Sequence, residues 1–193
     1  MKNIAIFASG SGTNAENIIN YFSNKNTAKV SLVLSNKREA FVLKRAKAHR
    51  IDSVFFDYKE FNTSKVLCYL LQYKIDFVVL AGFLWLVPEN ILNNFNKRII
   101  NIHPALLPDY GGKGMYGEKV HRSVVENQET ESGITIHYVN QQYDAGDIIF
   151  QARCRVDSSD TPEIVALKVH ALEYEHYPVV IEELISNLPD INQ

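Results

Sequence analysis

The chain has 193 residues, a formal net charge of −2 and 46% hydrophobic residues, a composition typical of a globular protein with a sizeable core. Its 20 Lys and Arg residues form no basic run, so we expect no nucleic-acid partner. The N-terminal apolar run, roughly five residues long, is too short for a secretion signal or a membrane span. We expect a cytoplasmic protein whose two cysteines, Cys68 and Cys154, are buried and reduced.

Strands alternate with helices through the first half of the chain. We expect strands at 3–8, 28–36, 52–57, 76–82 and 98–103, and helices at 15–22, 40–49, 63–73 and 88–95. The helix at 40–49 is expected to place Phe41, Leu43 and Ala46 on its apolar side. Continuously apolar strands are typical of parallel sheets covered on both faces. The predicted fold class is therefore α/β, with a Rossmann-like, doubly wound, mostly parallel sheet.

After His103 the pattern changes. A long connection contains "PDYGGKGMYG", and a short helix at 119–127, two strands and a long closing helix follow. We expect an antiparallel strand in this C-terminal part. Asp160 is expected to cap the closing helix, Pro162 to occupy its first turn and Pro178 to kink it. The sequence contains no repeat and no linker, so we expect one domain spanning residues 1–193.

The glycine turn "SGSGTN" at 9–14 connects the first strand to the first helix. It fits the loose GxGxxG/A pattern of dinucleotide sites, but the next strand ends in "SNK", where that pattern requires an acidic residue. The residues Gly12, Thr13 and Asn14 instead suit a single phosphate at the start of a helix. The alternative is that Thr13 or Asn14 only caps the helix.

Asn101 and His103 stand at the carboxyl end of a parallel strand, where ligands bind in α/β sheets. They are two residues apart, so their side chains share one face, and together they can donate hydrogen bonds to an oxyanion. Asp144, in the turn "YDAGD", is the candidate carboxylate for holding His103 charged or for letting it shuttle a proton near neutral pH. The alternatives are a histidine that ends a strand and an aspartate that forms a turn.

Five segments occur in an order and spacing that resemble phosphoribosylglycinamide formyltransferases: "SGSGTN", "VVLAGF", "NIHPALLP", "GITIHYV" and "YDAGDIIFQ". The resemblance covers nearly the whole chain. It implies transfer of a formyl group from 10-formyltetrahydrofolate to the glycyl amine of 5-phosphoribosylglycinamide in de novo purine biosynthesis, without a metal. Related enzymes that formylate methionyl-tRNA or hydrolyse the folate carry an additional domain, for which this length leaves no room.

The resemblance also implies roles for individual residues. Asn101 and His103 would stabilise the oxyanion, and Asp144 would support His103 and proton transfer. The N-terminal half would bind the ribonucleotide and the C-terminal half the folate. The implied ribonucleotide contacts are Gly12, Thr13, Asn14 and Glu173, and the implied folate contacts are Leu84, Trp85, Leu86, Val87, Asn101, Asn140, Gln141, Gln142 and Tyr143.

The sequence departs from many relatives at two places. An Arg that can face the folate glutamate is replaced by the segment "AGFLWLVP", which contains Trp85, and the connection at Gly111 to Gly117 is longer than the common form. Two other functions remain open: a formyltransferase acting on an amino sugar nucleotide, and a non-catalytic phosphate-binding module. The expected partners are small molecules, and the protein is expected to be a monomer or a homodimer.

Overall fold

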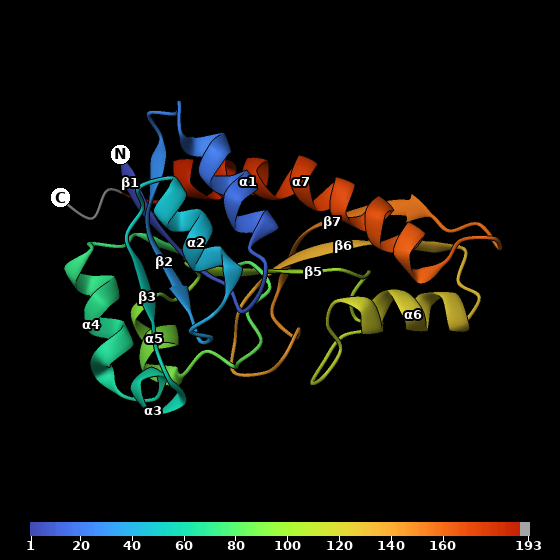
Figure 1. Cartoon of the computed structure of the whole chain (residues 1–193), viewed down its shortest axis with the longest axis horizontal. Helices are drawn as coiled ribbons and strands as arrows, with labels where there is room; N and C mark the ends of the chain where they lie inside the picture. The colour runs from blue at the N-terminus through green and yellow to red at the C-terminus, as the bar shows by residue number, and fades with distance from the viewer. Residues whose placement is uncertain (190–193) are drawn as a thin grey trace.

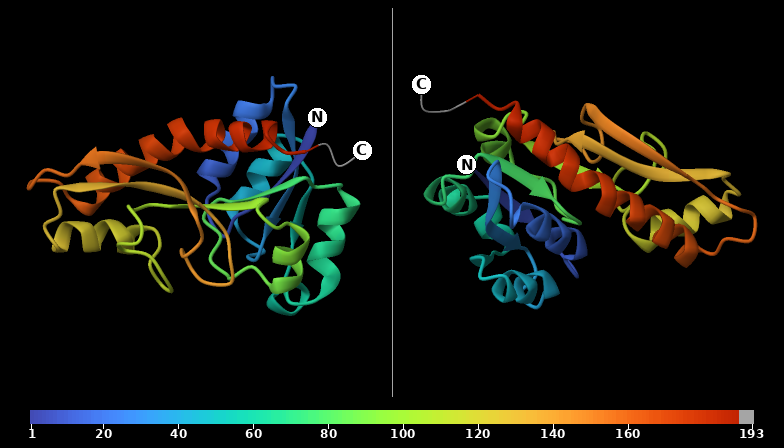
Figure 2. Two further views of the ribbon diagram at one scale, coloured as in Figure 1. Left: turned by 180° about the vertical axis from the view of Figure 1, so that it is seen from behind. Right: turned by 90° about the horizontal axis from the view of Figure 1, so that it is seen from above.

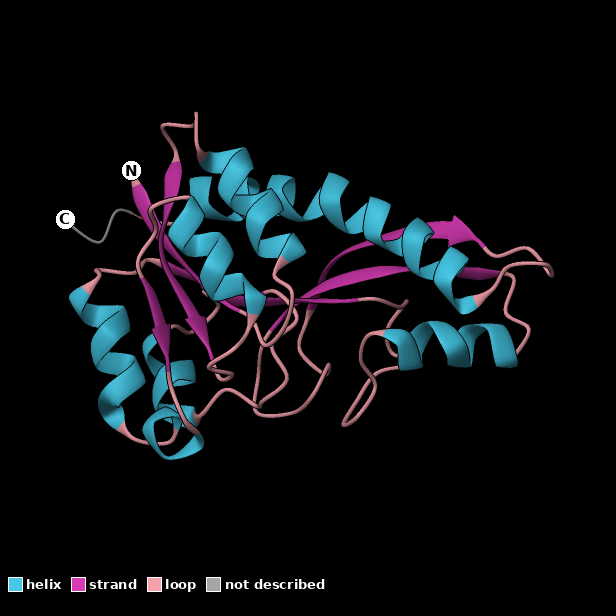
Figure 3. Cartoon of the chain, viewed as in Figure 1, coloured by secondary structure: helices cyan, strands magenta, loops and turns pink. Residues whose placement is uncertain are grey.

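The computed structural model describes residues 1–189, which form a seven-stranded sheet with helices on both faces (Figures 1 and 3). The strand order is β3-β2-β1-β4-β5-β6-β7. The first five strands in sequence are parallel, β6 is antiparallel to β5, and β7 is antiparallel to β6. The predicted fold class is confirmed. The strands are β1 (Lys2–Phe7), β2 (Ala28–Ser35), β3 (Ser53–Phe55), β4 (Phe77–Leu80), β5 (Ile99–His103), β6 (Glu131–Tyr138) and β7 (Ile148–Arg155).

The helices divide between the two faces of the sheet. α1, α2 and α7 contribute to one buried cluster, and α3, α4 and α5 contribute to the other. α6 packs against α7 beyond the parallel part, and α7 also packs on β6 and β7 (Figure 2). The helices are α1 (Thr13–Phe22), α2 (Phe41–Ala48), α3 (Tyr58–Phe61), α4 (Ser64–Gln72), α5 (Glu89–Asn94), α6 (Glu118–Glu126) and α7 (Pro162–Ser186).

Alternation along β1 explains the two cores. Ile4 and Ile6 belong to the cluster under α1 and α7, whereas Ala5 and Phe7 belong to the opposite cluster. All four side chains are at most 1% exposed. Burial of one such large aliphatic or aromatic side chain contributes roughly 1.5–3 kcal/mol, so the apolar strands hold both layers of helices on the sheet.

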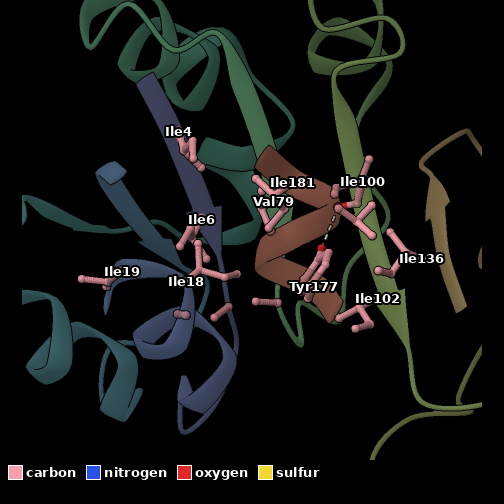
Figure 4. Close-up of a cluster of buried hydrophobic side chains, with 14 of the residues drawn as sticks. Ile4, Ile6, Ile18, Ile19, Val79, Ile100, Ile102, Ile136, Tyr177 and Ile181 are labelled. Carbon is pink, nitrogen blue, oxygen red and sulfur yellow. Dashed lines mark hydrogen bonds between the residues drawn. The ribbon is translucent and has the colours of Figure 1, made fainter. Parts of the chain in front are cut away.

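Tyr177 fixes α7 over the central strands. Its side chain is fully buried, and its hydroxyl donates to the carbonyl oxygen of Leu80 at 2.9 Å. The carbonyl oxygen of Ile100, on β5, lies 3.5 Å from the same hydroxyl (Figure 4). Burial raises the pKa of Tyr177 well above its ordinary value, so the hydroxyl keeps its proton for these carbonyls. α7 continues through Pro178, the next residue.

The start of α7 differs from the sequence prediction. Thr161 is the N-cap, and its hydroxyl accepts from the backbone N–H of Ile164, so the assignment of the cap to Asp160 was wrong. The Asp160 carboxylate instead accepts from the backbone N–H of Asp157 and from Lys168. It closes the preceding turn because its side chain lies one residue too early to reach the helix.

The buried side of α2 also differs. Val42 and Ala46, four residues apart, are fully buried, whereas Phe41 is 50% exposed. The Phe41 ring packs against the guanidinium of Arg45, 4.9 Å from the ring centroid. Of the three residues expected on the apolar side, Ala46 is buried and Leu43 packs partly buried against the core, so only the placement of Phe41 was wrong. A cation packs against its exposed ring instead.

The cysteines are less buried than expected. Cys68 is exposed on α4 and Cys154 is partly buried on β7, and both are free thiols. Within residues 1–189, none of the helices combines the length and apolar character required to cross a bilayer.

We predict that Tyr177→Phe lowers the free energy of unfolding by about 1–3 kcal/mol, because two buried carbonyls lose a donor without loss of the ring. Urea denaturation measures the change. The matched control is Tyr174→Phe, which alters a 40% exposed tyrosine of the same helix and should change stability by no more than about 0.5 kcal/mol. Equal effects of the two substitutions would contradict the role given to the Tyr177 hydroxyl.

Candidate functional site

A cavity of about 580 Å³ lies at the carboxyl ends of β1, β4 and β5. Its walls come from the glycine turn 10–14, the loop 81–85 after β4, the end of β5, the loop 112–117, and the turn at Tyr143 and Asp144. His121 of α6 and His170 and Glu173 of α7 complete the lining. A concave site at this edge is where an open α/β sheet binds its ligands.

The glycine turn exposes the N-terminus of α1 to this cavity. Gly12 is the N-cap, with a φ of 76°, and no side chain caps the helix. A Cβ at Gly12 would lie 2.4 Å from Cγ2 of Val42, so both the conformation and the close approach of α2 require glycine. The alternative that Thr13 or Asn14 serves as the cap is wrong. Without a side-chain cap, the N-terminus is open to an anion in the cavity.

Asn14, Glu173 and His170 form one hydrogen-bonded cluster between α1 and α7. Oε2 of Glu173 accepts from Nδ2 of Asn14 at 2.9 Å and lies 2.8 Å from Nδ1 of His170. The hydrogen bond to Glu173 raises the pKa of His170 although burial lowers it. Oδ1 of Asn14 is buried without a donor, so it is available to a ligand hydroxyl. The structure thus places the predicted residues Asn14 and Glu173 together.

Asn101, His103 and Asp144 also come together, at the end of β5. Nδ1 of His103 lies 3.5 Å from Oδ2 of Asp144, and Nδ2 of Asn101 lies 3.4 Å from Oδ1 of the same carboxylate. His103 is 3% exposed, and its Nε2 lies 2.8 Å from the carbonyl oxygen of Tyr110. A carbonyl can only accept, so Nε2 carries a hydrogen and Nδ1 faces Asp144.

Asp144 is held in its position by the backbone. Its φ is 52°, a left-handed conformation that aspartate tolerates better than most residues, and its Oδ2 accepts from the backbone N–H of Gly112 at 2.9 Å. Burial raises the pKa of Asp144, but the hydrogen bond with His137, the charge of His103 and the Gly112 N–H outweigh it, so the net pKa is below the ordinary value. The carboxylate is ionised at neutral pH.

The protonation of His103 follows from two opposed effects. Burial lowers its pKa, whereas the charge of Asp144 and the hydrogen bond to the Tyr110 carbonyl raise it, and burial prevails. We expected Asp144 to hold His103 as an imidazolium; the carboxylate acts in that direction but does not overcome burial. The imidazole is therefore neutral at pH 7 and can take up a proton at Nδ1, next to the carboxylate.

The mouth of the cavity is partly aromatic. Leu84, Trp85 and Tyr143 line it, and Trp85 packs edge-on against Tyr58, with ring centroids 5.3 Å apart. Of the other predicted folate residues, Asn101 lines the cavity at the end of β5, whereas the remaining five do not. Val87 is buried in the core, whereas Leu86, Asn140, Gln141 and Gln142 are exposed beside it. The Asn140 side chain orders its own turn by donating to the carbonyl of Ala145 and accepting from the backbone N–H of Gln142.

Three site histidines were missing from the sequence prediction. His137 of β6 lies opposite Asn101 in the antiparallel register, and its Nε2 is 3.1 Å from Nδ2 of Asn101 and 3.6 Å from Oδ1 of Asp144. His137 and Thr135 are two residues apart on an expected strand, which indicated that His137 could reach the site. We nevertheless interpreted His137 as a structural residue. His121 matches the family pattern but was given no role, and His170 was given none either, because this part of the lining is formed by packing of α6 against α7.

The described residues contain no group of three or more His, Cys, Asp or Glu side chains arranged to hold a metal ion. The arrangement can bind an anion at the helix start, a diol near Glu173 and a reacting carbonyl near Asn101 and His103.

Comparison with known proteins assigns the family. The profile described as formyl transferase matches residues 2–181. The chain belongs to the formyl transferase family. It is 34% identical to the phosphoribosylglycinamide formyltransferase of Bacillus subtilis over 191 residues, which is 96% of this chain and 95% of that protein. It is 40% identical to the chloroplastic phosphoribosylglycinamide formyltransferase of Arabidopsis thaliana over 187 residues, 93% of this chain but only 64% of that protein.

Solved structures of the family have the same fold. The phosphoribosylglycinamide formyltransferase of Bacillus halodurans superposes with a TM-score of 0.87 at 36% identity, covering 98% of each chain. The corresponding enzyme of Anaplasma phagocytophilum gives a TM-score of 0.88 at 31% identity, covering 96% of this chain and 87% of that one. The resemblance seen in the sequence motifs is thereby confirmed, and the chain is an enzyme of this family.

We predict that the imidazole of His103 titrates below its ordinary pKa of 6.5. Asp144→Asn should lower the midpoint further, because the variant lacks the negative charge that raises the pKa of His103 in the wild type. Titration by NMR of the histidine ring protons measures both values. His170 is the internal control: its midpoint should lie above 6.5 and stay unchanged in the variant. A rise of the His103 midpoint in Asp144→Asn would contradict the electrostatics described above. Since the folded state binds fewer protons at His103 than the unfolded chain does, this group destabilises the fold as pH falls below about 6.5.

Proposed function

We propose that this enzyme transfers the formyl group of 10-formyltetrahydrofolate to the glycyl amine of 5-phosphoribosylglycinamide in de novo purine biosynthesis. The observation that carries the proposal is that one cavity contains an open helix N-terminus, a buried carboxylate and the Asn101, His103 and Asp144 group. The names of the relatives supply the acceptor and the transferred group. We further propose that the enzyme acts in the cytoplasm, as a monomer or homodimer without a nucleic-acid partner.

The ribonucleotide is proposed to lie between α1 and α7. Its phosphate accepts from backbone N–H groups at Gly12, Thr13 and Asn14, where the helix dipole favours an anion. Glu173 accepts from the ribose hydroxyls. Its 4% exposure supports this role, because a buried carboxylate binds donors strongly when water is excluded. We therefore assign the ribonucleotide part of the cavity to the N-terminal half of the domain and to α7.

The folate is proposed to enter past Trp85 and Tyr143, with its pterin enclosed by the segment 84–87, by Asn101 and by the loop 140–144. The C-terminal half of the domain thus supplies much of the folate site. The apolar rings at the mouth suit a flat heterocycle, and unpaired backbone groups of a loop suit its polar edge. No metal takes part in this scheme.

The chemistry needs only side chains already in contact. The neutral glycyl amine attacks the formyl carbon, and the carbonyl electrons move onto the oxygen, which accepts a hydrogen bond from Nδ2 of Asn101. Nδ1 of His103 takes the proton that the amine loses, directly or through a water held by Asp144. The Nδ1–H of the resulting imidazolium, 3.5 Å from Asp144, donates to the oxyanion and passes its proton on to N10 as the C–N10 bond breaks, while Nε2–H stays on the Tyr110 carbonyl.

The assay that tests the function follows the absorbance change on folate deformylation, with and without 5-phosphoribosylglycinamide. We expect turnover only with the ribonucleotide, because water should not replace an amine positioned beside the formyl carbon. Turnover without it would indicate a hydrolase on the same fold. Turnover with an amino sugar nucleotide in its place, or none with any acceptor, would reject the proposed substrate.

We predict that Asn101→Ala and His103→Ala each lower kcat on the order of a hundredfold or more, because each removes an oxyanion donor. Asp144→Asn should fold normally and lose activity to a similar degree. Circular dichroism and steady-state kinetics measure the two properties. The control is His176→Ala, on α7 outside the cavity, where the ring packs on Phe150. Near wild-type turnover of His103→Ala would reject its catalytic role.

A further inference from the structure

Lys113 is the only Lys or Arg among the described residues that line the cavity. The lining also contains the carboxyl groups of Asp144 and Glu173 and the imidazole of His170, which already pairs with Glu173 at 2.8 Å. Both proposed substrates are anions. A phosphate monoester carries nearly two negative charges at pH 7. The helix N-terminus supplies only about half a positive charge. The cavity therefore needs a cation for its phosphorylated ligand.

Lys113 is free to supply that cation. It makes no hydrogen bond, ion pair or ring contact within residues 1–189, whereas Lys119, which follows on α6, lies over the ring of Tyr116, 5.3 Å from its centroid. The exposed Lys113 side chain therefore has no internal partner to give up when it binds an anion. An ammonium on a flexible stem is a suitable point charge for a phosphate.

The loop that carries Lys113 is tied to the reacting centre and leads to the ribonucleotide side. The backbone N–H of Gly112 donates to Asp144, and Gly117 is the N-cap of α6. On α6, the ring of His121 lies 6.1 Å from that of His170, which joins the Glu173 and Asn14 cluster at the start of α1. Gly112, Gly114 and Gly117 all have positive φ, so the backbone on both sides of Lys113 adopts conformations that favour glycine.

We infer that Lys113 binds the 5′-phosphate of the acceptor, together with the N-terminus of α1. The inference rests on the proposed function for the identity of the acceptor. The carboxylates of folate sit at the end of that molecule away from N10, so the ribonucleotide phosphate is the anion on the side of the cavity that the loop reaches. Lys113 is a substrate-binding residue and does not touch the transferred formyl group.

The test compares Lys113→Ala, Lys113→Arg and the control Lys119→Ala in steady-state kinetics. Loss of a charge-assisted hydrogen bond corresponds to roughly a tenfold to hundredfold rise in KM. We expect this rise for the ribonucleotide in Lys113→Ala, with KM for the folate unchanged, and values near wild type in the other two variants. A rise in the folate KM instead, or no rise at all, would overturn the assignment.

A second substrate identifies the group that Lys113 contacts. Glycinamide riboside lacks the phosphate, so Lys113→Ala and the wild type should use it equally well, and an equal loss with both acceptors would overturn the inference. Calorimetry with ribose 5-phosphate gives a readout that needs no turnover. If the wild type failed to formylate the ribonucleotide, the proposed function would fall, whereas weaker binding of ribose 5-phosphate to Lys113→Ala would still support the anion site. Equal binding would overturn it.

Discussion

The site depends on the contacts of the Asp144 carboxylate, which lies largely buried between two imidazoles with its side chain 10% exposed. Its Oδ2 faces His103 and the Gly112 N–H, and its Oδ1 faces His137 and Asn101. A buried carboxylate is unfavourable without such partners, and an unpaired buried imidazole must stay neutral. The four contacts therefore tie the ends of β5 and β6, the glycine-rich loop and the turn after β6 into one unit.

This unit forms where the sheet changes from parallel to antiparallel. β5 pairs in parallel with β4 on one side and antiparallel with β6 on the other. The antiparallel register sets His137 directly opposite Asn101, and Thr135 opposite His103. The Thr135 hydroxyl donates to the carbonyl of Ala105 and accepts from the backbone N–H of Leu107, which fixes the chain as it leaves β5. The chain that follows the apolar strand β5 thus has its backbone groups at Ala105 and Leu107 paired with the Thr135 hydroxyl.

The two ends of the cavity rest on different parts of the fold. At one end, α7 is fixed by Tyr177 over β4 and β5, and it presents Glu173 one helical turn away, next to Asn14 of α1. At the other end, Trp85 and Tyr143 come from loops, which relatives can vary without disturbing the sheet. The two departures from relatives that we expect from the sequence, near Trp85 and at 111–117, both lie in such loops.

The sequence by itself determined the fold class and the main polar groups. Apolar strands alternating with helices led to the doubly wound sheet, and the strand end at Asn101 and His103, the glycine turn and the "YDAGD" turn were each visible as local patterns. Such patterns are readable because strand alternation and helix starts depend on neighbours only two to four residues apart.

Only the tertiary structure decided which distant groups meet and in what protonation state. Asn14 and Glu173 are 159 residues apart in sequence, and their hydrogen bond depends on packing of α7 against α1. His121 and His170 line the cavity for the same reason. The lowered pKa of His103 arises from burial, which local sequence does not determine. Asp144 favours the imidazolium, as expected, but burial outweighs it in the folded protein. Local sequence patterns identified the candidate site residues. Packing between distant segments determined the distances between them and the protonation state of His103.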